Sequence, residues 1–199
     1  MQKILCVEGS PRKGGNSDIL MRHMVKGSRD NNVPVEEILL RNYRFQSCSG
    51  CERCRQDRRC TGFEDDMQLI YPGIVESRGL ILISPVHNYN ITAMMKSFID
   101  RLYPFYNFDV KRPGRWSSRL EHQNRKAIVA AIAEQSSPQD SGINLALQAL
   151  RLPVEALGYE VIAEMPVTGI FEKGKIAQYP DVLAEAEALG KRLAVLINT

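Results

Sequence analysis

The sequence lacks both a strong excess of charge of one sign and long apolar runs. It carries 26 Lys and Arg against 23 Asp and Glu, a formal net charge of +3 over 199 residues. So small a global charge does not indicate a nucleic-acid-binding protein. The longest apolar run, Ala127 to Ala133, is too short to cross a bilayer, and Ile4 to Val7 is too short for the apolar region of a signal peptide. We therefore expect a cytoplasmic protein with no nucleic-acid partner and no membrane partner.

Repeats, linkers and low-complexity stretches are also missing, and we expect a single domain over residues 1–199. Short apolar runs alternate with segments of helical period, a pattern typical of a parallel sheet flanked by helices. The five predicted strands are Ile4 to Val7, Val35 to Leu40, Gly79 to Ser84, Ala127 to Ala133 and Tyr159 to Met165. The predicted helices are Asp18 to Asp30, Asp66 to Ser77, Ala93 to Tyr103, Gly142 to Leu157 and a last helix that starts at Pro180. Pro72 and Pro153 are expected to kink or split two of these helices.

Cysteine is scarce and unevenly placed, because four of the five cysteines, Cys48, Cys51, Cys54 and Cys60, stand within CSGCERCRQDRRC. In a reducing compartment such a group indicates metal binding or redox chemistry rather than a disulfide framework. Gaps of two residues recur where thiolates hold an iron-sulfur cluster, and a fourth ligand further on would complete the set. Two other interpretations stay open, a group of exposed thiols and a tetrahedral zinc site, although zinc modules usually pair two C-x2-C units across a longer separation. Cys6 lies in an apolar run and is expected to be a buried packing residue.

The loop after the first predicted strand reads GSPRKGGNSD, a polar, glycine-rich turn of the kind that binds phosphate at the edge of an α/β sheet. It is not a Walker A loop, because Gly14 is followed by glycine and asparagine instead of lysine and a hydroxyl residue. It is not a dinucleotide fingerprint, because no glycine stands two residues after Gly9. The donors that it offers to one phosphate monoester are Ser10, Arg12, Asn16 and Ser17. The alternative is an ordinary turn in which Ser17 or Asn16 caps the helix and Arg12 points to solvent.

GSPRKGGNS, together with the later segment SPVHNYNITAMMKSFIDR, resembles the flavodoxin-like NADPH-dependent FMN reductase superfamily. Its members carry a GSPR-type phosphate loop and an SPVY…MK.F.DR segment. The cysteine spacing, followed by Asp65, Asp66 and Met67, resembles the iron-sulfur flavoprotein branch, in which a compact cysteine motif holds a 4Fe-4S cluster. The resemblance implies an α/β, flavodoxin-like fold with a five-stranded parallel sheet, helices on both faces and a cysteine-rich loop insertion (48–60) after strand 2.

The resemblance also implies a set of site residues. For the FMN phosphate they are Ser10, Arg12, Asn16 and Ser17, for the isoalloxazine ring Pro85, Val86, His87 and Asn88, and for a third flavin-facing loop Ala133, Glu134 and Gln135. The third loop lacks the paired glycines common there. His87 replaces the usual tyrosine, and Tyr89 replaces a small residue, so their roles cannot be copied from relatives. A histidine here could donate to reduced flavin or substrate, and the alternative is a packing role.

From the resemblance we expect an FMN-dependent oxidoreductase, a homodimer or homotetramer, that passes electrons through FMN and a 4Fe-4S cluster to an unidentified small-molecule acceptor. The expected donor is a ferredoxin-type electron-transfer protein or NAD(P)H. The arginines around the cysteines are Arg53, Arg55, Arg58 and Arg59. Such a basic collar would steer an acidic ferredoxin or bind the phosphate of NADPH, and a solvated surface is the alternative.

Two other functions stay open from the sequence. In the first, the cysteines are empty and the protein is an NAD(P)H-dependent FMN or quinone reductase that works by hydride transfer alone. In the second, it is a non-catalytic, zinc-bearing flavodoxin-like module that docks on a partner.

Overall fold

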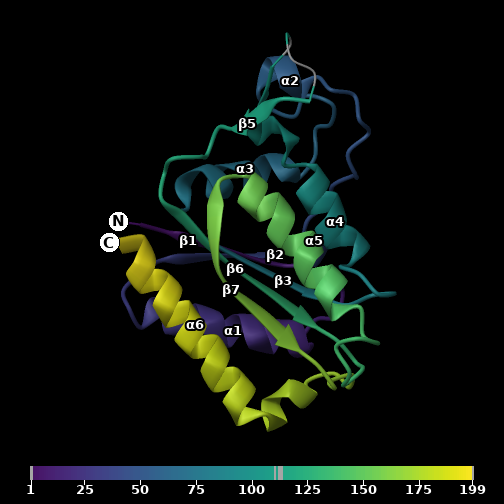
Figure 1. Ribbon diagram of the computed structural model, residues 1–199, viewed down its shortest axis with the longest axis vertical. Coiled ribbons are helices and arrows are strands. Elements are labelled where there is room, and N and C mark those ends of the chain that lie inside the picture. The colour runs from purple at the N-terminus through teal and green to yellow at the C-terminus, as the bar shows by residue number, and fades with distance from the viewer. Residues whose placement is uncertain (1, 110, 112–113, 199) are drawn as a thin grey trace.

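The computed structural model describes residues 2–109, 111 and 114–198. Its centre is a five-stranded parallel sheet of β1 (Ile4–Glu8), β2 (Val35–Leu39), β3 (Gly79–Pro85), β6 (Arg125–Ile132) and β7 (Tyr159–Val167). The strand order is β2-β1-β3-β6-β7 (Figure 1). This is the order of a flavodoxin-like sheet, in which ligands bind beyond the carboxyl ends of the strands. The predicted fold class is confirmed.

Helices cover both faces of the sheet (Figure 1). One face carries α1 (Asn16–Arg29) and α6 (Pro180–Asn198), and the other carries α3 (Met67–Glu76), α4 (Ala93–Asp100) and α5 (Ile143–Ala156). Successive strand residues point to opposite faces. Leu5 and Val7 of β1 therefore pack with α3, α4 and α5, whereas Ile4 and Cys6 pack with α1 and α6. Cys6 is fully buried, as expected.

The two helices α1 and α6 cross where neither has a side chain. A Cβ atom at Gly27 would lie 1.9 Å from the carbonyl oxygen of Glu187, and one at Gly190 would lie 1.9 Å from that of Met24. The hydroxyl of Ser28 donates across the crossing to the Gly190 carbonyl at 3.0 Å. This close packing fixes α1, whose first turn faces the sheet edge where ligands bind.

Several elements that the sequence did not predict gather at the end of the molecule where Figure 1 labels α2 and β5. They are the short helix α2 (Cys54–Asp57), the 3₁₀ helix η2 (Tyr103–Phe105) and an antiparallel hairpin of β4 (Tyr106–Phe108) and β5 (Trp116–Ser118). Another 3₁₀ helix, η1 (Leu40–Asn42), directly follows β2. A third 3₁₀ helix, η3 (Lys175–Gln178), precedes α6.

Three expectations about helices need correction or comment. Pro72 and Pro153 lie inside α3 and α5, and both helices continue through them, so the expected splitting is wrong. The helix predicted to reach Tyr103 ends at Asp100. Among the helices in the described part of the chain, none is both long enough and apolar enough to cross a membrane.

Candidate functional site

A cavity of about 440 Å³ opens at the carboxyl edge of the sheet. All four predicted phosphate-loop residues line it, namely Ser10, Arg12, Asn16 and Ser17. The residues predicted after β3 also line it, namely Pro85, Val86, His87 and Asn88, as does Glu134 after β6. Loops that are far apart in the sequence thus converge on one cavity, because parallel strands end at the same edge.

Two predicted residues do not line this cavity. Ala133 is buried, its N–H donates to the Val167 carbonyl at 2.8 Å, and its own carbonyl accepts from the Ile170 N–H at 3.1 Å. Its side chain therefore belongs to the core beneath α5. Gln135 is exposed, and its carbonyl accepts from the Gly169 N–H at 3.1 Å. These bonds continue the pairing of β6 with the segment after β7.

Three residues after β7 line the cavity and were missed: Ile170, Phe171 and Lys173. The guanidinium carbon of Arg12 lies 5.4 Å from the Phe171 ring centroid, so Arg12 packs on that ring instead of only facing water. Lys173 approaches the phosphate loop at Gly14. The only signal in the sequence was that this segment follows the fifth predicted strand and so reaches the same edge.

The first turn of α1 has no side-chain cap. Its N-cap is Gly15, and neither Asn16 nor Ser17 takes that role, so the capped-turn alternative is wrong. The Asn16 amide instead holds the segment before α6, donating to the Glu172 carbonyl at 3.0 Å and accepting from the Ile176 N–H at 3.2 Å. Uncapped N–H groups and the positive end of the helix dipole make this turn an anion site.

A buried network of charges holds the phosphate loop. Arg41 of η1 donates to Glu8 at 2.7 Å and to both carboxylate oxygens of Asp18 at 2.9 and 2.8 Å. Glu8 accepts from the Ser10 N–H at 2.8 Å, and Asp18 accepts from the Gly14 N–H at 2.7 Å. Burial and the neighbouring Asp18 raise the pKa of Glu8 to about 8, and the bonds from Arg41 and Ser10 offset this only in part.

The loop after β3 is fixed to its neighbours through Thr92, the N-cap of α4. Its hydroxyl donates to the Gly9 carbonyl at 2.7 Å, which ties this loop to the phosphate loop. His87 is exposed, and its backbone pairs with Asn90 across a tight turn. A Cβ at Gly142 would lie 2.5 Å from the Tyr89 Cα, so the residue before α5 packs directly against the backbone of this turn.

The four clustered cysteines line a second, much smaller pocket of about 20 Å³. Burial raises the pKa of Cys54, and the three other thiols raise it further. A hydrogen bond with the backbone of Arg53 lowers the pKa of Cys51. Across the described residues, no group of three or more His, Cys, Asp or Glu side chains is arranged to hold one metal ion. The room between the thiols is about that of a single water, so a larger group requires this loop to open.

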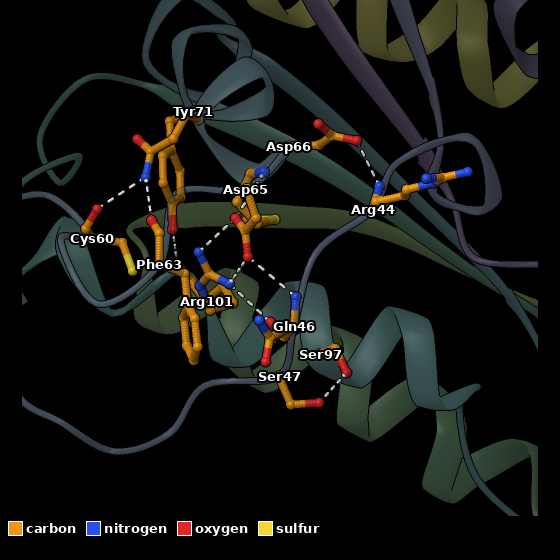
Figure 2. Close-up of polar contacts among 12 residues, drawn as sticks. Arg44, Gln46, Ser47, Cys60, Phe63, Asp65, Asp66, Tyr71, Ser97 and Arg101 are labelled. Atoms are coloured by element: carbon orange, nitrogen blue, oxygen red, sulfur yellow. Dashed lines mark hydrogen bonds and ion pairs between the residues drawn. The ribbon is translucent and has the colours of Figure 1, made fainter.

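The two ends of the cysteine segment are joined by a stem (Figure 2). The N–H of Arg44 donates to Asp66 at 2.6 Å, and the N–H of Gln46 donates to Asp65 at 3.1 Å. Arg101 closes the stem with hydrogen bonds of 2.7 and 2.9 Å to the two carboxylate oxygens of Asp65. Burial opposes ionisation of Asp65, but the bonds from Arg101 and Gln46 prevail and lower its pKa.

The two pockets lie at opposite ends of α4. Residues 85–88 of the large cavity precede its N-cap, whereas the cysteine pocket contacts Asp100 and Arg101 at its C-terminal end. A helix of 8 residues is about 12 Å long. Within one chain, α4 therefore lies between residues 85–88 of the large cavity and the cysteine pocket.

The four arginines of the basic collar differ in their side-chain contacts with the described residues. Arg53 donates to the Thr61 carbonyl at 3.3 Å, and Arg55 pairs with Glu52 at 3.2 Å while lying 4.4 Å from the Phe108 ring centroid. Arg58 and Arg59 are exposed, and neither forms an ion pair with a described residue.

Comparison with known proteins decides the family. A profile described as NADPH-dependent FMN reductase matches residues 2–167 of the chain. The chain belongs to this family. Because the match covers most of the chain, the resemblance carried by the phosphate loop and the SPVHNYN segment is confirmed.

Curated relatives place this family member near the iron-sulfur flavoproteins. The chain is 35% identical over 103 residues to an iron-sulfur flavoprotein of Archaeoglobus fulgidus, a match that covers 52% of this chain and 46% of the relative. It is 31% identical over 102 residues to one of Methanocaldococcus jannaschii, covering 51% and 52%. The chain thus spans about half the length of these relatives. An NAD(P)H:quinone oxidoreductase from Methanothermobacter marburgensis shares the fold, with a TM-score of 0.73 and 18% identity over 96% of this chain and 98% of that one.

The raised pKa of Glu8 predicts a dependence of stability on pH for this FMN reductase family member. Folded Glu8 keeps its proton to about pH 8, whereas an unperturbed glutamate loses it near 4.5. Over that range the native state binds more protons than the unfolded state, so the free energy of unfolding falls as pH rises and levels off above it. We expect the wild type to lose over ~1 kcal/mol more than Glu8→Gln between pH 5 and pH 8, measured by urea denaturation.

The control for this measurement is Glu185→Gln, an exposed glutamate of α6, which should follow the wild-type curve. Parallel curves for wild type and Glu8→Gln would show that Glu8 is ionised throughout.

Proposed function

We propose that the protein is an FMN-dependent oxidoreductase that passes electrons between a reduced donor and an acceptor through FMN and an iron-sulfur cluster. The observation that carries the proposal is the uncapped first turn of α1, which opens into the 440 Å³ cavity between Arg12 and Lys173. A helix N-terminus flanked by two cations suits one phosphate dianion. In a member of the NADPH-dependent FMN reductase family, FMN is the ligand that fits it.

The protein's residues have separate tasks at this cavity. Arg12, Lys173 and the α1 amides bind the phosphate, while Ser10 and Ser17 add hydroxyl donors beside them. Residues 85–88 and Glu134 border the place of the ring. When bound, FMN accepts a hydride as a pair of electrons and can release electrons singly. His87 stands exposed at this border, where its imidazole can donate or accept a hydrogen bond, which makes it the proposed catalytic residue.

The phosphate assignment predicts a selective loss of FMN affinity. Arg12→Ala and Lys173→Ala should each weaken FMN by about 1.5–3 kcal/mol, because each removes a charge-assisted contact. Riboflavin has no phosphate, so its affinity should not change. Fluorescence titration of both flavins measures this. Lys13→Ala is the matched control, since Lys13 is an exposed neighbour that does not line the cavity. An equal loss for riboflavin would place Arg12 beside the ring through Phe171 instead.

The cysteine pocket is the proposed site of a 4Fe-4S cluster. Four thiols line it, and four thiolates are the donor set that iron-sulfur clusters use. The other lining residues of a type that commonly binds metal are Glu52 and Asp100. A Cβ at Gly62 would lie 2.9 Å from the sulfur of Cys51, so any other residue at this position would displace that sulfur. The names of the curated relatives give the same chemistry for those proteins. When bound, a cluster takes up electrons one at a time, which complements the two-electron chemistry of a flavin.

Replacement of single cysteines separates the three interpretations of this pocket. Cys48, Cys51, Cys54 or Cys60 changed to serine should abolish iron and acid-labile sulfide while FMN stays bound, because the two pockets lie at opposite ends of α4. Cys6→Ala should keep both cofactors. Metal, sulfide and flavin analysis of anaerobically purified protein measures this. Zinc without sulfide would favour the docking module, and flavin without metal would favour the cluster-free FMN or quinone reductase.

The proposed donor is a ferredoxin-type protein, and NAD(P)H is the competing donor. Support comes from the unpaired Arg58 and Arg59 beside the cysteines, which would attract an acidic partner. A homodimer or homotetramer is part of the proposal, and the exposed Tyr103, Trp116 and Leu152 offer it an apolar surface beside the same pocket.

Changing the two arginines tests the donor. Arg58→Gln/Arg59→Gln should slow oxidation of reduced ferredoxin at low salt, and the difference should fade as the screening length falls to ~10 Å at 0.1 M. NADPH oxidation should be unaffected. Lys191→Gln/Arg192→Gln on α6 removes the same charge far from the cysteines and serves as control. If the two double variants oxidise reduced ferredoxin at equal stopped-flow rates at low salt, the arginine collar is only a solvated surface.

A further inference from the structure

Arg101, at the C-terminal end of α4, is a buried cation with one donor left over. Its side chain is 1% exposed. The two terminal nitrogens are occupied, since one bonds to Asp65 and to the Gln46 carbonyl at 2.8 Å and the other bonds to Asp65. The remaining nitrogen, Nε, is buried without a hydrogen-bond partner among the described residues. A charged N–H buried without an acceptor carries a large desolvation cost.

The surroundings of Arg101 join it to the cysteine pocket. Arg101 and Cys60 line that pocket together. The guanidinium carbon lies 4.9 Å from the Phe63 ring centroid, and the Tyr71 hydroxyl donates to the Arg101 carbonyl at 2.9 Å. Figure 2 shows Cys60 across from Arg101 and Tyr71, with its carbonyl held by Gln68 at 2.9 Å. Besides Asp65, the Tyr71 hydroxyl and the Cys60 sulfur interact with the Arg101 guanidinium, and of these two only the sulfur belongs to the predicted metal ligands.

We propose that Arg101 is a positioning residue for the metal centre, which donates its Nε–H to the sulfur of Cys60 or to a cluster sulfur beside it and so raises the reduction potential of the cluster. This inference rests on the proposed iron-sulfur function. A reduced cluster carries one more negative charge than an oxidised one, and hydrogen bonds to its sulfurs favour the reduced form. The effect is large in a buried site, where water screens charge poorly.

The chemistry of arginine explains why this residue type stands here. A guanidinium is planar and can hold a carboxylate with its two terminal nitrogens while Nε stays available on another edge. Asp65 therefore fixes the plane of the group and neutralises much of its charge, and Nε supplies a directed donor. Lysine would keep the charge but could not make both contacts in a fixed geometry.

The test measures the cluster potential of FMN-loaded protein by redox titration, following the cluster by electron paramagnetic resonance. Arg101→Gln/Asp65→Asn removes both charges as a matched pair, so no buried charge is left alone. At a fixed redox poise, we expect the ratio of reduced to oxidised cluster to fall about tenfold, which is about 59 mV for a one-electron couple. Arg101→Lys should lower the ratio in the same direction. The flavin potential in the same samples should not move.

Several outcomes would overturn the inference. An unchanged cluster potential in both variants, with iron and sulfide retained, would leave Arg101 as a structural residue of the stem. Loss of the cluster from both variants would also overturn it, because Arg101 would then serve to form the loop. Wild-type protein without iron and sulfide would instead overturn the proposed function itself, so the two failures are distinguishable.

Discussion

Arg41 of η1, directly after β2, donates hydrogen bonds to two buried carboxyl groups, Glu8 and Asp18, which in turn accept hydrogen bonds from backbone N–H groups of the phosphate loop. The geometry of the large cavity depends on this buried pairing. Removing one partner of such a pair leaves a buried charge alone, at a cost of about 3–5 kcal/mol. Asp65, which follows the cysteine segment, forms the same kind of pair with Arg101, while Arg41 precedes that segment. Two guanidinium groups thus bound the cysteine segment on both sides and connect it to the sheet.

The central strands β1, β3 and β6 could be predicted from the sequence because they are buried on both faces and appear as short apolar runs, whereas the edge strands β2 and β7 are only partly buried. All five lie close to their predicted bounds. The β4–β5 hairpin could not be predicted, because strands of 3 residues are too short for alternation to be detected. Neither Pro72 nor Pro153 splits its helix, although proline lacks the N–H that an internal helical hydrogen bond needs.

The site was predictable only where a local motif carries it. The phosphate loop and the loop after β3 have such motifs, and their residues meet in the cavity. Phe171 and Lys173 have none, since Arg12 meets Phe171 across 159 positions of the chain. The prediction for Ala133 was wrong because successive side chains of an extended chain point in opposite directions. The Ala133 side chain packs in the core, whereas Glu134 lines the cavity. Asn16 lines the cavity as well, and the binding of its amide side chain to the backbone before α6 joins segments too far apart in the sequence for a local motif to indicate it.

The stem of residues 44–46 and 65–66 determines how oxidation of the cysteines would affect the rest of the fold. The stem fixes both ends of the cysteine segment by contacts that involve none of the thiols. None of the cysteines of this segment belongs to the sheet or lines the large cavity, so what the thiols hold bears on the loop first. Cys48 and Cys51 are exposed, and oxidation of these thiols would change a loop that contributes no residue to the sheet or to the large cavity.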